Sequence, residues 1–183
     1  VLNNYDKFSK VTKPKTIDSS CPINQVITPK VTPSQKRNVV IIVEESFGAR
    51  YVQSLSGDPI APELEKLKNE GWWFERLYAT GHRSVRGLEA ITASYPPSPL
   101  ASQVKLEHRE ELTTISSIYK RLGYKTSFIY GGESHFDSMR SYFLNNGVEE
   151  IIEQKDYKDP EFVASWGVSD EDLFKKANEK FVK

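Results

Sequence analysis

The sequence is short of several features on which many proteins depend. It has a single cysteine, Cys21, so no disulfide can form within the chain. One cysteine suits the cytoplasm and the periplasm equally, so cysteine content does not decide the compartment. The longest apolar run extends from Val39 to Val43, far short of the roughly 20 residues that a membrane-spanning helix requires. No membrane span is therefore predicted within this sequence.

Net charge and a leader segment are also missing. The 25 Lys and Arg residues balance the 25 Asp and Glu residues, so composition offers no electrostatic argument for a nucleic-acid partner. The opening residues, VLNNYDKFSK, contain no apolar segment typical of a signal peptide and do not start with Met. We therefore expect an excerpt of a longer or processed protein, with any membrane anchor outside it.

Two parts of the chain differ in composition. Residues 1–37 contain prolines at positions 14, 22, 29 and 33, many Lys, Ser and Thr residues, and little periodicity. This composition predicts an extended linker or arm, or more simply a loosely packed extension. Periodic segments begin at Asn38, and 11 % of the residues are aromatic, which indicates a globular domain over residues 38–183.

Strand-like and helix-like segments alternate through this domain. Apolar patterning predicts strands at 39–43, 72–78, 124–130 and 148–152. Proline, hydroxyl and glycine signals predict helices at 62–71, 84–94, 115–122, 138–144 and 170–182. Thr113 or Thr114 is expected to cap the third helix, and Ser169 the last one. Repeated alternation predicts an α/β fold with a mostly parallel sheet and right-handed crossovers.

Ligands of such sheets bind at the carboxyl ends of the strands. The first of these ends carries Glu44 and Glu45, directly after the apolar run. Two adjacent carboxylates at a buried strand end repel each other and lose hydration, and a divalent cation with hard oxygen ligands relieves both costs. The alternative interpretation is a solvated loop that happens to be acidic.

The second end is the segment ATGHRSVRGLEA, in which Ser84 stands where a helix begins. The positive end of a helix dipole suits a phosphate or sulfate ester and favours the alkoxide of a serine placed there. His82, Arg83 and Arg86 are close enough in sequence to hold ester oxygens. The alternative interpretation is that Ser84 is only a helix cap.

The third end is YGGESHFDSMR, which follows the predicted strand at 124–130. Gly131 and Gly132 would let the backbone approach a ligand closely. His135, Asp137 and Arg140 would supply polar side chains at the same strand end. The alternative interpretation is a glycine turn before a capped helix.

Several motifs together resemble one protein family. They are NVVIIVEESFG, PELEKLKNEGWWFERLYATGHRSVRGLEAITASYPPSP, TSFIYGGESHFDSMRSYFLNNG and SWGVSDEDLF. In order and spacing they are similar to the lipoteichoic acid synthase and phosphoglycerol transferase branch of the sulfatase (alkaline phosphatase-like) superfamily. The resemblance implies a three-layer α/β/α fold with a mostly parallel sheet, incomplete at the C-terminal end. It also implies that residues 38–183 are the N-terminal portion of a sulfatase-like catalytic domain.

The resemblance implies roles for particular residues. Glu45 would bind a divalent ion, Mn²⁺ or Mg²⁺ first and Ca²⁺ as a further option, with Glu44 as a second candidate ligand. Ser84 would be both nucleophile and metal ligand, and Thr80 is the fallback if the alignment slips. The substrate-binding residues carried over are Arg83, Arg86, His135 and Arg140.

One departure from the family pattern concerns the metal site. The family completes it with an Asp-His pair, but none of His82, His108 and His135 follows an Asp. We therefore expect this chain to bind metal weakly and to lack turnover on its own.

The implied activity is transfer of phosphoglycerol from phosphatidylglycerol to a glycan or glycerol-phosphate acceptor, through a phospho-serine-type intermediate. It implies a membrane-tethered enzyme on the extracytoplasmic side, which acts on a phospholipid head group. The alternatives are a phosphoethanolamine transferase, a sulfatase and a non-catalytic binding domain. A sulfatase is less favoured because Ser84-Val85-Arg86-Gly87-Leu88 lacks the Pro and the Arg of the C/S-x-P-x-R context.

Overall fold

The computed structural model describes residues 36–96, 99–106 and 112–181. The chain divides into two compact units, Val1–Arg76 and Leu77–Lys183. The predicted arm at 1–37 lies outside the described residues except for its last two. Its expected boundary therefore stays a prediction.

The first unit contains short helices joined by turns. These are η1 (Ala49–Tyr51), η2 (Gln53–Leu55) and α2 (Pro62–Leu67). Pro62 stands at the start of α2, where its missing N–H costs no helical hydrogen bond. Glu65 ties α2 to η2, because its Oε1 accepts a hydrogen bond from the Ser54 backbone N–H at 2.7 Å. The predicted helix at 62–71 is confirmed, and it ends earlier, at Leu67.

Two predicted strands are not formed. Residues 39–43 and 72–78 have no regular secondary structure. The five residues from Val39 to Val43 are all exposed, with Ile42 at 61 %. A strand exists only where a neighbour pairs with it, and no described strand pairs with either segment. Their apolar patterns alone therefore misled the prediction of regular strands.

The second unit contains the elements that position the candidate site. Its helical elements are α3 (Ser84–Ala93), η3 (Gln103–Lys105), α4 (Ile115–Arg121), η4 (Phe136–Ser138), α5 (Met139–Asn145), η5 (Gln154–Asp156) and α6 (Asp170–Phe181). Its strands are β1 (Ser127–Ile129), β2 (Glu150–Ile152), β3 (Val163–Ala164) and β4 (Gly167–Val168). Every helix predicted in this unit is present, with boundaries shifted by at most one residue.

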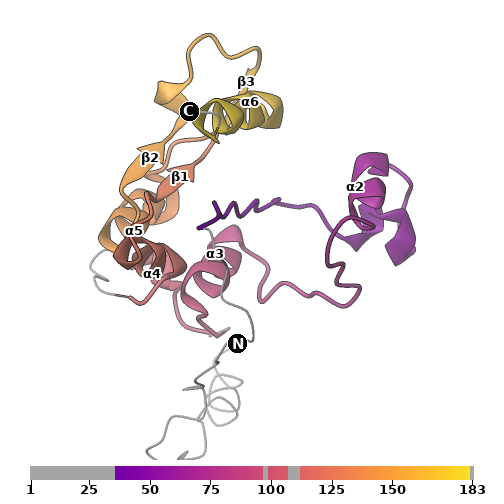
Figure 1. Ribbon diagram of the computed structural model, residues 1–183, viewed down its shortest axis with the longest axis horizontal. Coiled ribbons are helices and arrows are strands. Elements are labelled where there is room, and N and C mark those ends of the chain that lie inside the picture. The colour runs from indigo at the N-terminus through magenta and orange to yellow at the C-terminus, as the bar shows by residue number, and fades with distance from the viewer. Residues whose placement is uncertain (1–35, 97–98, 107–111, 182–183) are drawn as a thin grey trace, which may run out of the picture. The chain divides into compact units, whose positions relative to one another are not determined.

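β1 and β2 form a parallel pair, seen side by side in Figure 1, with Phe128 opposite Ile151. The chain crosses from β1 to β2 through η4 and α5, which is the connection that parallel strands require. Both strands are shorter than the predicted ranges of 124–130 and 148–152. β3 and β4 form an antiparallel hairpin that the sequence did not predict, with Ala164 paired to Gly167.

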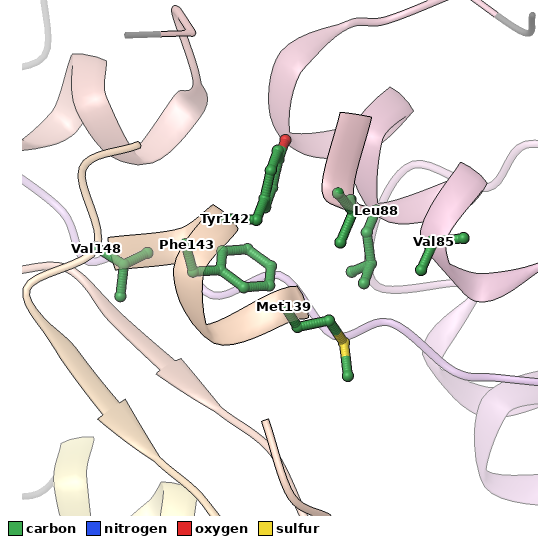
Figure 2. Close-up of a cluster of buried hydrophobic side chains, with 7 residues drawn as sticks. Val85, Leu88, Met139, Tyr142, Phe143 and Val148 are labelled. Carbon is green, nitrogen blue, oxygen red and sulfur yellow. The ribbon is translucent and has the colours of Figure 1, made fainter. Parts of the chain in front are cut away.

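The core of this unit lies where α3, η3 and α5 meet. Figure 2 shows apolar side chains of α3 and α5 meeting beside the chain that leads into β2. The buried cluster consists of Val85, Leu88, Val104, Met139, Tyr142, Phe143 and Val148. Burying each large apolar side chain contributes about 1.5–3 kcal/mol, so this cluster holds α3, η3 and α5 together.

Local signals at helix ends explain the confirmed helices. Thr114 caps α4 in a capping box with Ser117: its Oγ1 accepts the Ser117 N–H at 3.0 Å, and the Ser117 Oγ accepts the Thr114 N–H at 3.0 Å. Ser169 plays the same part at α6, where its Oγ accepts the Asp172 N–H at 3.1 Å. Gly147, after α5, has a φ of 100°, a conformation that L side chains rarely adopt.

Candidate functional site

Ser84 is the first residue of α3, and its side chain is exposed. The N-cap position belongs to Arg83, which is extended (φ −124°, ψ 142°) and makes no side-chain cap hydrogen bond. The backbone N–H of Arg86 donates to the Arg83 carbonyl at 2.9 Å and starts the helix. The interpretation of Ser84 as a simple N-cap is therefore wrong. Ser84 stands one residue further in, at the positive end of the helix dipole.

The turn before α3 is packed tightly against the first turn of the helix. A Cβ added at Gly81 would lie 2.8 Å from the Arg86 Cβ, so this position accommodates little beyond glycine. Thr80, the fallback nucleophile, donates from Oγ1 to the Arg86 carbonyl at 3.4 Å. The hydroxyl of Thr80 thus contacts the helix backbone, while Ser84 occupies the helix terminus itself.

Arg86 belongs to a buried polar network. Its Nη1 lies 2.8 Å from Oε1 of Glu89, whose side chain is only 1 % exposed. The other carboxylate oxygen of Glu89 accepts the Ser102 hydroxyl at 2.8 Å and the Gln103 N–H at 2.6 Å. Arg86 Nη2 also donates to the Leu100 carbonyl. At least part of the Arg86 guanidinium therefore holds η3 and the residues before it against α3.

Gly131 and Gly132, which follow β1, lie close to the β3–β4 hairpin. The Gly131 carbonyl accepts the Val168 N–H at 2.9 Å. A Cβ added at Gly132 would lie 2.5 Å from the Trp166 carbonyl oxygen. The small size of Gly132 is thus needed for packing against the β3–β4 hairpin, a reason the sequence alone did not reveal.

The segment that follows carries His135 and Arg140. His135 is exposed, with its Nε2 3.4 Å from Glu133 Oε2. Asp137 has a φ of 52°, in the left-handed region, and an ion pair of 2.6 Å between its carboxylate and Lys105 of η3 holds it there. Because η3 also contacts α3 through Glu89, it links the helix of Ser84 to the segment of His135.

Sequence reasoning missed Glu153, which follows β2 directly. Its buried carboxylate accepts hydrogen bonds from Ser134 and from Arg140 Nη1, the latter at 3.1 Å, and Lys155 Nζ lies 2.5 Å away. Hydrogen bonds from Lys155 and then Ser134 lower the pKa of Glu153 to about 2. The signal that could have found it is the one used for Glu45: an acidic residue directly after an apolar strand.

Glu44 and Glu45 lie in the first unit, at an exposed turn where Ser46 has a φ of 59°. Ser84 lies in the second unit, so joint coordination of one ion by Glu45 and Ser84 stays a prediction. Within the described residues, no group of three or more His, Cys, Asp and Glu side chains is placed to hold a metal ion. Across those residues, too, no helix has the length and apolar character needed to cross a membrane.

Comparison with known proteins places this arrangement in a family. The sulfatase family model matches residues 37–182. Phosphoglycerol transferase I of Escherichia coli (strain SMS-3-5 / SECEC) is 26 % identical over 163 residues, which is 83 % of this chain and 21 % of that protein. The chain therefore spans about a fifth of the length of the curated relatives it matches.

Two solved structures show the fold. A protein of the alkaline phosphatase superfamily from Vibrio parahaemolyticus is 52 % identical, with a TM-score of 0.72 over 74 % of this chain and 34 % of that one. The lipoteichoic acid synthase LtaP of Listeria monocytogenes is 19 % identical, with a TM-score of 0.58 over 64 % of this chain and 29 % of that one. They confirm the predicted alkaline phosphatase-like α/β fold, and the chain belongs to the sulfatase family.

Proposed function

We propose that the protein transfers a phosphoglycerol group from phosphatidylglycerol to a glycan or glycerol-phosphate acceptor on the extracytoplasmic side of the bacterial cytoplasmic membrane. The observation that carries the proposal is the position of Ser84, exposed at the first residue of α3, with Arg83 before it. The similarity to phosphoglycerol transferase I supports the choice of substrate. Residues 38–183 would supply part of the catalytic domain, and a segment outside this sequence would reach the membrane.

The chemistry follows from that position. The Ser84 hydroxyl oxygen attacks the phosphorus of phosphatidylglycerol, gives up its proton and forms a glycerophosphoryl-serine diester. The bond from phosphorus to the diacylglycerol oxygen breaks, and diacylglycerol leaves with a proton. An acceptor hydroxyl then attacks the same phosphorus, gives up its proton and releases Ser84. The helix terminus stabilises the negative charge of the ester throughout.

Four cationic or polar side chains would bind the head group. Arg83 adjoins Ser84, and Arg86 follows in the first turn of α3. His135 and Arg140 come from the segment after β1, and Arg140 remains 42 % exposed despite its contact with Glu153. Arginine pairs well with phosphate oxygens because its N–H groups form a planar fork. We expect these groups to orient the ester rather than to exchange protons with it.

A divalent ion, Mn²⁺ or Mg²⁺, would stabilise the Ser84 alkoxide when bound. Glu45 and Ser84 are hard oxygen donors of the right chemistry, with Glu44 as a further candidate. Two or three oxygen donors do not complete the coordination shell of such an ion. The described residues alone also hold no cluster of three acidic, His or Cys ligands, so Glu45, Ser84 and Glu44 would be only part of the ligand set.

The test is an assay of the full-length protein with phosphatidylglycerol, phosphatidylethanolamine and an aryl sulfate. Ser84→Ala should lower turnover of phosphatidylglycerol by at least about a thousandfold, and Thr80→Ala should retain most of it. Trapping a phosphoglycerol adduct on the peptide that contains Ser84 would identify the intermediate. Retained transfer by Ser84→Ala would remove Ser84 from the mechanism, and preference for either other substrate would reassign the enzyme.

A further inference from the structure

A buried carboxylate lies beneath the segment that carries His135 and Arg140. Glu153 follows β2 and is only 8 % exposed. It accepts the Ser134 backbone N–H at 3.1 Å and the Ser134 hydroxyl. Its other oxygen lies 3.1 Å from Arg140 Nη1 and 2.5 Å from Lys155 Nζ. Glu153 thus contacts a residue next to His135 and also contacts Arg140 itself.

Backbone hydrogen bonds also hold the segment from Gly132 to Arg140 in place. The Arg140 backbone N–H donates to the Ser134 carbonyl at 2.7 Å, and the Gln154 N–H donates to the Gly132 carbonyl at 3.0 Å. Ser134 is fully buried, at 0 % exposure. The N–H, the hydroxyl and the carbonyl of Ser134 therefore all form hydrogen bonds. These bonds fix the backbone next to His135, whose side chain is exposed.

The negative charge of Glu153 strengthens the hydrogen bonds that it accepts from Ser134 and Arg140. A buried carboxylate without donors is costly, whereas one that accepts several hydrogen bonds stabilises the groups that donate them. The hydrogen bonds from Lys155 and Ser134 lower the pKa of Glu153 to about 2, so it is ionised at neutral pH. A carboxylate that holds one edge of a guanidinium also sets the direction of the remaining N–H groups. Arg140 combines this contact with a side chain that is 42 % exposed.

We propose that Glu153 is a positioning residue, which holds Ser134 and Arg140 so that His135 and Arg140 bind the head group of the substrate. It does not touch the substrate and acts only through these two neighbours. The inference rests on the proposed function for the identity of the ligand, phosphoglycerol. The anchoring itself rests on the contacts of Glu153 alone.

The first measurement is hydrogen exchange of residues 132–140 in the full-length protein. Glu153→Gln keeps the size of the side chain but removes its charge. Lys155→Met is the matched control because Lys155 is 68 % exposed and lies in η5, outside the segment 132–140 whose exchange is measured. Exchange should accelerate at least about tenfold in Glu153→Gln, as expected when a charge-assisted hydrogen bond is lost. Lys155→Met should stay within about twofold of the wild type. Ser134→Ala, which removes one donor from a buried site, should change exchange in the same direction and covers the case in which Glu153→Gln fails to fold.

The second measurement separates positioning from a purely structural role. In Glu153→Gln the KM for phosphatidylglycerol should rise on the order of tenfold while kcat stays within about threefold, because uniform binding is lost. Faster exchange with unchanged KM would reduce Glu153 to a structural residue and overturn the inference, as would unchanged exchange. A wild-type protein that neither turns over phosphatidylglycerol nor binds glycerol phosphate would refute the proposed function and this role together.

Discussion

Replacing Arg86 with methionine should lower the free energy of unfolding, because it leaves a buried carboxylate without its cation. Glu89 is 1 % exposed and Arg86 20 % exposed, with 2.8 Å between Nη1 and Oε1. Removing one partner of a buried ion pair costs about 3–5 kcal/mol. Ser102 and Gln103 still donate to Glu89 after the change, so we expect a loss of about 2–3 kcal/mol.

The assay is urea unfolding of the full-length protein, followed by a double-mutant cycle. Combining Arg86→Met with Glu89→Gln should cost less than the sum of the two single changes, with a coupling of about 1–3 kcal/mol. Arg83→Met is the matched control. Arg83 is exposed and makes no cap hydrogen bond with its side chain, so its replacement should change stability by less than about 0.5 kcal/mol.

The result decides how Arg86 contributes. A loss of stability in Arg86→Met with additional loss of turnover would fit a residue that serves both the fold and the substrate. If Arg86→Met and Arg83→Met unfold at the same urea concentration, the buried pair does not stabilise α3 and the reasoning from its geometry is refuted.

Three further variants test other parts of the second unit. The lowered pKa of Glu153, about 2 against an ordinary 4.5, makes its contribution to stability present above pH 4.5 and lost as pH falls through 2. Acid titration of unfolding should show this loss in the wild type but not in Glu153→Gln, with a size of about 1–2 kcal/mol after discounting the exposed Lys155. Gly147→Ala should destabilise by about 2–4 kcal/mol, because φ is 100° and the new Cβ would lie 2.5 Å from the Ser117 backbone. Gly87→Ala, within α3 and with no atom within 4 Å of the new Cβ, should instead stabilise by about 0.5–1 kcal/mol; equal thermal unfolding temperatures for the two alanine variants would contradict this account.

Helices were predictable because their signals are local. Pro62, Thr114 and Ser169 each mark a helix start within a few residues, and the structure confirms all three. Strands depend on partners elsewhere in the chain. The same kind of apolar pattern marked 39–43 and 124–130, yet only the second contains a strand, β1, which pairs with β2.

The candidate site shows the same division between local and distant information. The place of Ser84 at the start of a helix followed from its neighbours in sequence. Glu89 and Glu153 were missed because each also binds a donor far away in sequence, Ser102 at 13 residues and Ser134 at 19 residues. Gly132 was interpreted as room for a ligand, but its close neighbour is the Trp166 carbonyl, a contact that only the three-dimensional structure could reveal.

The exposed run from Val39 to Val43 also has charged neighbours of opposite sign at its two ends. Lys36 and Arg37 precede it, and Glu44 and Glu45 follow it. If several copies stacked in parallel and in register, each end would bring like charges together, which opposes fibre-like self-association. An antiparallel pair would match basic residues with acidic ones. These two charge clusters therefore permit antiparallel pairing of two copies, while they disfavour the parallel stacking that β-branched segments otherwise promote.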